Sequence, residues 1–256
     1  MSSTGFGGFP LEHGPREGES IVFLHGGSMA GWTWAPQVEG LPGRHLLTPD
    51  LPGFGAKAGQ TWPGAAGAAD SVAELIREHA IGGRAHLVGL STGGYVAAEL
   101  VERHPDLVRS CLISGSALAG YSRLETLVVK AQLPFWTARW YWGALASAFG
   151  VPAADRPLFA DTATAPSPAT NRALVENCCT GILDGMRFDY PGPVLAVAAE
   201  RDVPSVRRAF APLRARLPQL QTWIAPKVHH AWSSENPELF NEMVAGFVDT
   251  GSWPLP

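Results

Sequence analysis

Short apolar runs alternate along much of the chain with segments of helical spacing. Continuous runs of four to eight mostly apolar residues, bounded by glycine, proline or polar residues, are typical of strands that are covered on both faces. This pattern predicts strands at residues 21–24, 45–48, 86–89, 108–114, 194–198 and 221–225. Apolar spacing of three and four residues predicts helices at 34–41, 68–79, 95–103, 206–217 and 237–248.

Alternating strands and helices favour parallel strands joined by right-handed crossovers. We therefore expect an α/β fold: a doubly wound, mostly parallel sheet flanked by helices. The alternation stops between residues 119 and 189, which are mostly helix-like and carry proline punctuation, and it resumes afterwards. This predicts a core formed by residues 1–118 and 190–256, with residues 119–189 as an inserted helical cap. Residues 1–19, rich in Gly, Ser and Pro, are interpreted as an irregular leader.

The composition of the chain argues against several classes of protein. With 46% apolar and 16% charged residues, the 256-residue chain can bury a sizeable core and is too apolar for a disordered protein. A net charge of −4 gives no reason to expect nucleic acid or an anionic membrane as a partner. The apolar runs are strand-sized, well short of the ~20 residues that span a bilayer. The first twenty residues lack the basic start and apolar run of a secretory signal. We expect a cytoplasmic protein that acts on a small molecule.

Cysteine usage agrees with that compartment. Three cysteines do not form a disulfide framework. Cys111 lies in a predicted strand and is interpreted as a buried thiol. The neighbours Cys178 and Cys179 are interpreted as two free thiols, because a bond between adjacent cysteines is strained.

The segment around Ser91 is the first candidate for chemistry. It reads Gly89-Leu90-Ser91-Thr92-Gly93, between a predicted strand and a predicted helix. Glycines two residues before and after the serine remove Cβ atoms that would collide in a sharp turn. Such a turn lifts the hydroxyl above the sheet, and the following helix directs its first amides toward developing negative charge. A chance serine in an ordinary turn would need no partners, whereas a catalytic one needs a base, an acid and oxyanion donors.

Histidine is the expected base because its pKa range allows it to accept the serine proton. His229 and His230 follow the last predicted strand, at the carboxyl edge of the sheet where Ser91 also lies. One of these two is the predicted base. The histidines at helix or strand ends are interpreted as surface residues: His79, His86 and His104.

A third group must fix the tautomer of the base. Asp202 follows the predicted strand 194–198 and is the leading candidate, with Glu200 as its competitor and a helix N-cap as its alternative role. The oxyanion requires amides aimed at one point, and the amides of Gly27 and Thr92 are the predicted donors. His25, next to Gly27, is interpreted as a residue that holds the loop.

Taken together, these segments resemble the α/β-hydrolase fold family over about residues 20–118 and 190–250. The resemblance rests on Leu24-His25-Gly26-Gly27, Asp50-Leu51-Pro52-Gly53-Phe54-Gly55, the Ser91 turn, Glu200-Arg201-Asp202, and His230 with Glu235-Asn236-Pro237-Glu238. It implies a Ser-Asp-His triad. In such relatives the histidine usually stands five residues before a Glu-x-Pro-Glu segment, and this spacing selects His230. The family usually has glycine where His229 stands, and its first two strands are missing or shortened here. Some relatives carry the acid after the preceding strand, but Ser114-Gly115-Ser116 contains no carboxylate.

The resemblance also bears on the substrate. Serine at position 91 argues against the dehalogenase and epoxide-hydrolase branches, which have aspartate there. Hydroxynitrile lyases of similar layout have a lysine close to the histidine, where this chain has Ala231. The predicted cap is aromatic, and its rings either pack the helices together or form a hydrophobic wall over Ser91. The proposed wall residues are Trp136, Trp140 and Trp142.

The leading hypothesis is a serine hydrolase, without cofactor or metal, that cleaves a carboxylic ester, thioester or lactone with a bulky apolar or aromatic part. Ser91 attacks, His230 moves the proton, Asp202 orients His230, and the amides of Gly27 and Thr92 hold the oxyanion. One alternative uses the same triad for C–C cleavage, lyase, cyclase or perhydrolase chemistry. Another is a ligand receptor that retains a slow triad under its cap.

Overall fold

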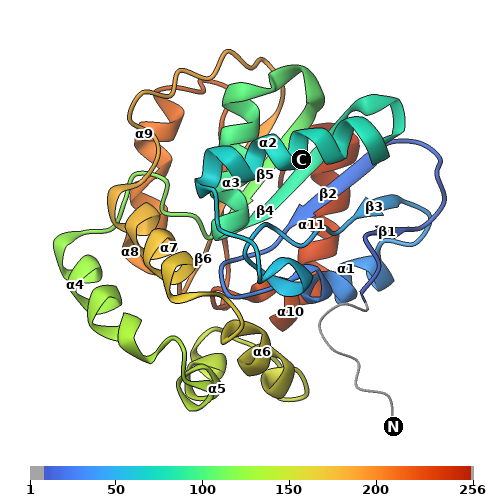
Figure 1. Cartoon of the computed structure of the whole chain (residues 1–256). Coiled ribbons are helices and arrows are strands. Elements are labelled where there is room, and N and C mark those ends of the chain that lie inside the picture. Colours follow the sequence, from blue (N-terminus) through green and yellow to red (C-terminus); the bar gives the residue numbers. More distant parts are fainter. Residues whose placement is uncertain (1–8, 255–256) are drawn as a thin grey trace, which may run out of the picture.

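A seven-stranded sheet forms the centre of the computed structural model, which describes residues 9–254 (Figure 1). Its strand order is β1-β3-β2-β4-β5-β6-β7. The strands are β1 (Glu12–His13), β2 (Ser20–Leu24), β3 (His45–Leu47), β4 (Ala85–Leu90), β5 (Val108–Ser114), β6 (Val194–Ala199) and β7 (Gln221–Ala225). β1 pairs antiparallel with β3, and every other neighbouring pair is parallel. The predicted mostly parallel sheet is confirmed.

Helices cover both faces of this sheet. Those of the core are α1 (Ala35–Gly40), α2 (Gly64–His79), α3 (Thr92–Arg103), α8 (Pro204–Arg208), α9 (Phe210–Arg214), α10 (Trp232–Glu235) and α11 (Pro237–Thr250). Short 3-10 helices occupy Gly31–Trp34, Gly55–Lys57, Ile81–Gly83, Pro105–Leu107 and Leu133–Phe135. Within residues 9–254, no helix has the length and apolar character needed to cross a lipid bilayer.

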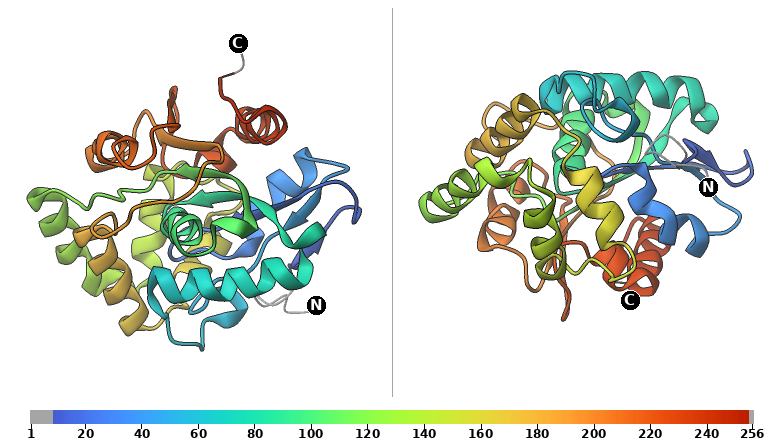
Figure 2. Two further views of the ribbon diagram at one scale, coloured as in Figure 1. Left: turned by 90° about the horizontal axis from the view of Figure 1, so that it is seen from above. Right: turned by 60° about the horizontal axis from the view of Figure 1, so that its bottom comes forward.

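The two faces of the sheet build two hydrophobic clusters, because successive side chains of a strand point to opposite sides. In β2, Val22 and Leu24 pack into the cluster that contains α2 and α3. Ile21 and Phe23 pack into the cluster that contains the apolar side of α11. Figure 2 shows the sheet between α2 and α11. This burial on both faces explains why the strands are continuous apolar runs.

The helical insert is outside the sheet. It consists of α4 (Arg123–Gln132), α5 (Arg139–Ala148), α6 (Arg156–Ala163) and α7 (Pro168–Thr180), which lie together at one end of the molecule (Figures 1 and 2). Its two ends meet: Ile182 N donates to Leu118 O at 2.9 Å, and Tyr121 N donates to Cys178 O at 2.8 Å. The insert therefore leaves and rejoins the core at one narrow neck.

A carboxylate near the neck ties α4 to the core. Glu125 accepts hydrogen bonds from Ser122 N at 2.7 Å and Ser205 N at 3.1 Å, and it pairs with Arg208 at 2.6 Å. Burial by itself raises the pKa of Glu125, but the hydrogen bonds from Ser122 and Ser205 outweigh it and lower the pKa to about 2. Because Ser205 and Arg208 belong to α8, this carboxylate joins the insert to the helix that follows Asp202.

Some elements differ from those predicted. β1 lies inside the predicted irregular leader, of which residues 1–8 are outside the described part of the chain. The single helix predicted at 206–217 is two short helices that break at Ala209. The break has a clear cause: Pro212 has no amide hydrogen to donate to the carbonyl of Arg208. The cysteines are free as predicted, and Cys111 is buried.

Candidate active site

Ser91 occupies a strained turn between β4 and α3. Its φ of 52° and ψ of −114° lie in a region that residues other than glycine rarely adopt. Close backbone contacts explain the flanking glycines: a Cβ at Gly89 would lie 2.4 Å from Gly93 O, and one at Gly93 would lie 2.0 Å from Leu24 O. Side chains at either position would push α3 away from the sheet. Strain of this kind concentrates at functional sites.

The two predicted oxyanion donors are neighbours in space. A Cβ built on Gly27 would lie 2.9 Å from Thr92 Oγ1. Thr92 is the first residue of α3, so its amide has no carbonyl partner within the helix. The same Gly27 Cβ would lie 3.1 Å from Leu174 Cδ1 in α7, so the insert covers this loop. The aim of the two amides at a reacting oxygen stays a prediction.

His25 holds the loop that carries Gly27. Leu51 N donates to His25 Nε2 at 3.0 Å, so the ring proton is on Nδ1, which donates to Gly26 O at 2.8 Å. The ring is fully buried, and this burial lowers the pKa of His25 and keeps it neutral. Both nitrogens are used within the loop, in agreement with the structural interpretation.

Asp202 and His230 form a direct pair. Asp202 lies in the turn after β6, and His230 Nδ1 donates to its Oδ1 at 2.6 Å. Asp202 Oδ2 accepts from Ala199 N at 2.8 Å, and only 1% of the aspartate side chain is exposed. This arrangement fixes the proton on Nδ1 and leaves Nε2 as an acceptor.

The charge of Asp202 alters the basicity of His230. Burial disfavours the imidazolium, but the Coulombic attraction and the hydrogen bond from Asp202 outweigh it, so the pKa of His230 is raised above its ordinary value. The ring is 23% exposed. His230 is thus a stronger base than a free histidine and remains accessible to a reacting group.

The competing residues have other partners. His229 Nδ1 donates to Glu235 at 2.8 Å, and Arg201 Nη1 donates to His229 Nε2 at 3.1 Å. Glu200 is exposed and accepts from Lys227 N at 2.8 Å. His229 therefore has no free ring nitrogen, whereas His230 pairs with a buried acid and keeps Nε2 free within residues 9–254.

Ser91 and His230 both lie against the turn that follows β5. Ser91 N donates to Ser114 O at 2.8 Å, and a Cβ on the adjacent Gly115 would lie 2.9 Å from His230 Cε1. Trp232 Nε1 donates to Ser114 Oγ at 2.9 Å and fixes the segment after His230. Across residues 9–254, no hydrogen bond joins Ser91 Oγ to His230 Nε2. Unliganded catalytic sites often have such bonds long and close them on substrate.

The aromatic residues of the insert differ in their placement. Trp142 is buried, and its Nε1 donates to Trp136 O at 2.7 Å; the two rings are 5.3 Å apart. Trp140 is 67% exposed and packs on the rings of Phe135 and Tyr141. The role of Trp140 as a wall over Ser91 stays a prediction.

The aromatic ring beside the candidate base comes instead from the segment after α5. The ring centroid of Phe149 is 5.7 Å from that of His230. Phe149 belongs to the aromatic set of the predicted cap, but no sequence signal distinguishes it as a site residue.

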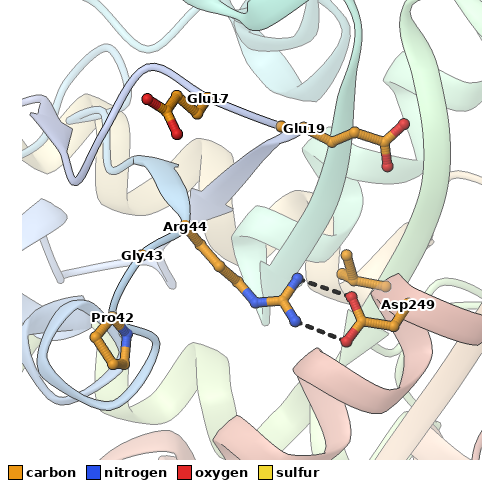
Figure 3. Close-up of a pocket in the computed structure, with 8 residues that line it drawn as sticks. Glu17, Glu19, Pro42, Gly43, Arg44 and Asp249 are labelled. Carbon is orange, nitrogen blue, oxygen red and sulfur yellow. Dashed lines mark hydrogen bonds and ion pairs between the residues drawn. The ribbon is translucent and has the colours of Figure 1, made fainter.

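A polar cavity lies at the other edge of the sheet. It encloses about 540 Å³ near the amino ends of β2 and β3, and Arg44 reaches across it to donate to Asp249 at 2.9 and 2.7 Å (Figure 3). Close by, His86 is 5% exposed and hydrogen bonds to Ser110 and Glu19, which corrects its assignment to the surface. Because Ser91 follows the carboxyl end of β4, this cavity is not part of the candidate site.

Comparison with known proteins identifies the family. A model of the alpha/beta hydrolase family matches residues 21–243. The chain belongs to the alpha/beta hydrolase family.

Two curated proteins are similar to part of this chain. An AB hydrolase superfamily protein of Gibberella zeae is 38% identical over 109 residues, 42% of this chain and 38% of that protein. A pimeloyl-[acyl-carrier protein] methyl ester esterase of Aeromonas hydrophila is 33% identical over 135 residues, 51% of this chain and 44% of that protein. The matches span less than half the length of either relative.

A solved structure matches more of the chain. Est816, described as an N-acyl homoserine lactone degrading enzyme, is 25% identical with a TM-score of 0.68, and the match covers 92% of this chain and 95% of that one. The α/β-hydrolase resemblance of the sequence, including its helical insert, is confirmed.

Proposed function

We propose that this chain is a serine hydrolase that cleaves a carboxylic ester, thioester or lactone with a bulky apolar part. The observation that carries the proposal is the 2.6 Å hydrogen bond between His230 and the buried Asp202, next to the turn that holds Ser91. Esterase and lactone-degrading activities in the names of similar proteins support the substrate class.

The mechanism follows from the tautomer of His230. Ser91 Oγ attacks the carbonyl carbon as its proton passes to His230 Nε2, and Asp202 stabilises the imidazolium. The amides of Gly27 and Thr92 hold the oxyanion. The tetrahedral intermediate collapses, the bond to the leaving alcohol or thiol breaks, and His230 returns the proton to that group. Water then gives a proton to His230 and attacks the acyl-enzyme, which releases the acid and restores Ser91.

The proposal assigns two further roles. Residues 119–189 act as the cap over a core of residues 1–118 and 190–256, with Leu174 of α7 above Gly27. Trp136 and Trp142 pack against each other, and Phe149 lies against the His230 ring. These rings provide an apolar boundary that favours a bulky acyl or alcohol group.

Ser91→Ala tests the proposal directly. With nitrophenyl esters, thioesters and lactones of graded acyl size, we expect the variant to lose at least about a thousandfold in kcat/KM and to lose labelling by a fluorophosphonate probe. Ser71→Ala, at an exposed position of α2, is the matched control and should keep both. Parental turnover in Ser91→Ala would refute the nucleophile. A parent that is labelled once but does not turn over would refute hydrolysis and favour a receptor.

A further inference from the structure

A second hydrogen-bonded string runs beside the Asp202–His230 pair. Arg201 precedes Asp202, and His229 precedes His230; Arg201 Nη1 donates to His229 Nε2 at 3.1 Å. His229 Nδ1 and N then donate to the two carboxylate oxygens of Glu235, at 2.8 and 2.7 Å. We propose that His229 is a positioning residue that holds Asp202 and His230 in register; this rests on the proposed function.

The string links the two loops that carry the candidate acid and base. Arg201 N donates to Val228 O at 3.1 Å, so the loops are joined by their backbones one residue before Asp202 and two residues before His230. Glu235 belongs to α10 and grips His229 at both its backbone and its ring. The imidazole of His229 therefore bridges the acid loop on one side and α10 on the other, and its loss removes a support from both loops at once.

The same string supports the insert. A Cβ on Gly150 would lie 2.5 Å from Glu235 Oε2 and 3.2 Å from His229 Cβ, so the segment after α5 packs directly on the pair. Ala231 N donates to Phe149 O at 2.8 Å, and the Phe149 ring lies against His230. Movement of His229 would thus displace the ring beside the base as well as the base itself.

The donors and acceptors fix the tautomer of His229. Arginine only donates, so Nε2 accepts from Arg201 and the ring proton is on Nδ1, toward Glu235. The charged groups that face the ring are Arg201, from the turn after β6, and Glu235, from α10; the segment at 149–150 contributes no charge. Both ring nitrogens are therefore engaged, one by each loop-supporting partner.

The experiment compares kcat and KM of the parent, His229→Ala and His229→Gln on the same ester. Glutamine provides one acceptor and donors, so it can still bridge Arg201 and Glu235. His229→Ala should lose about tenfold in kcat, with a smaller change in KM, and glutamine should restore most of the lost kcat. His104→Gln, which removes a histidine bound to Asp70 at the far end of α3, should keep the parental kcat.

The outcomes separate this inference from the proposed function. If the parent is active and Ser91→Ala is not, an unchanged kcat in a folded His229→Ala refutes the positioning role. A folded His229→Gln that is no more active than a folded His229→Ala refutes it as well. If His229→Ala does not fold, Arg201→Ala, which removes the donor to His229 Nε2, decides: an unchanged kcat in that variant refutes the role. An inactive, unlabelled parent would instead refute the proposed hydrolase itself.

Discussion

Replacing Gly93 with alanine tests whether the strained serine turn depends on the close approach of α3 to β2. Gly93 is the second residue of α3 and has an ordinary helical φ, so alanine is compatible with its backbone conformation. The only obstacle to alanine is the lack of space for its Cβ atom. The added carbon would lie 2.0 Å from Leu24 O and 2.9 Å from His25 O, where contacts under 3.0 Å essentially never occur. Both oxygens are backbone atoms and cannot rotate away from the added carbon.

The size of the effect follows from that geometry. Relief of the contact requires α3 and β2 to separate by about 1 Å, an overpacking at the upper end of the usual cost, about 3 kcal/mol in the free energy of unfolding. For a chain of this size that lowers the melting temperature by about 6–12 °C. The same displacement moves Ser91 and Thr92 away from Gly27, and we expect kcat/KM to fall by about a hundredfold in the folded protein.

Thermal unfolding followed by circular dichroism measures the first effect, and ester turnover below the transition measures the second. Gly143→Ala is the matched control: Gly143 lies inside α5 with nothing within 4 Å of an added Cβ. There the same change should stabilise the helix by about 0.5–1 kcal/mol. If Gly93→Ala melts within about 2 °C of the parent and keeps its turnover, the contact is not what holds the turn.

Two further predictions concern carboxylates. The pKa of Glu125 is lowered in the folded state, so the stabilisation that it contributes is present above its ordinary pKa and is lost as the pH falls toward 2. Glu125→Gln should therefore lower the free energy of unfolding by roughly 2–3 kcal/mol at pH 7. Denaturant titrations at decreasing pH should show the stabilities of parent and variant converging near pH 2. Asp202→Asn should lower kcat/KM by about 10³–10⁴ at pH 7. It also removes the interactions that raise the pKa of His230, so the acid limb of any residual activity should move to lower pH; an unmoved limb would contradict the pairing.

Much of the fold was predictable because its central strands, β2, β4, β5 and β6, are almost entirely buried. Val108–Ser114 was predicted with its exact bounds, because its apolar residues from Cys111 to Ile113 are followed by the turn at Gly115. β1 was missed because two residues at a sheet edge carry no periodicity. The proline at 212, by contrast, was a visible signal that the predicted helix at 206–217 would break.

Some residues of the candidate site were likewise predictable from the sequence, and others were not. Asp202 and the pair His229 and His230 were predicted because each follows a strand at the same edge of the sheet, and the family resemblance then selected His230. The burial of His86 was not predicted, because its partners Glu19 and Ser110 are 67 and 24 residues away in the sequence and become neighbours only through strand pairing. Phe149 was missed as a site residue for a similar reason: its contact with His230 depends on how the segment after α5 packs.

The neck at Leu118 and Ile182 makes the helical insert a unit that can be exchanged as a whole. Because its exit and re-entry points already hydrogen bond to each other, recombination there exchanges α4–α7 and leaves every strand pairing in place. Under the proposed function, such an exchange would change the acyl groups accepted while Ser91 and its strand keep their geometry.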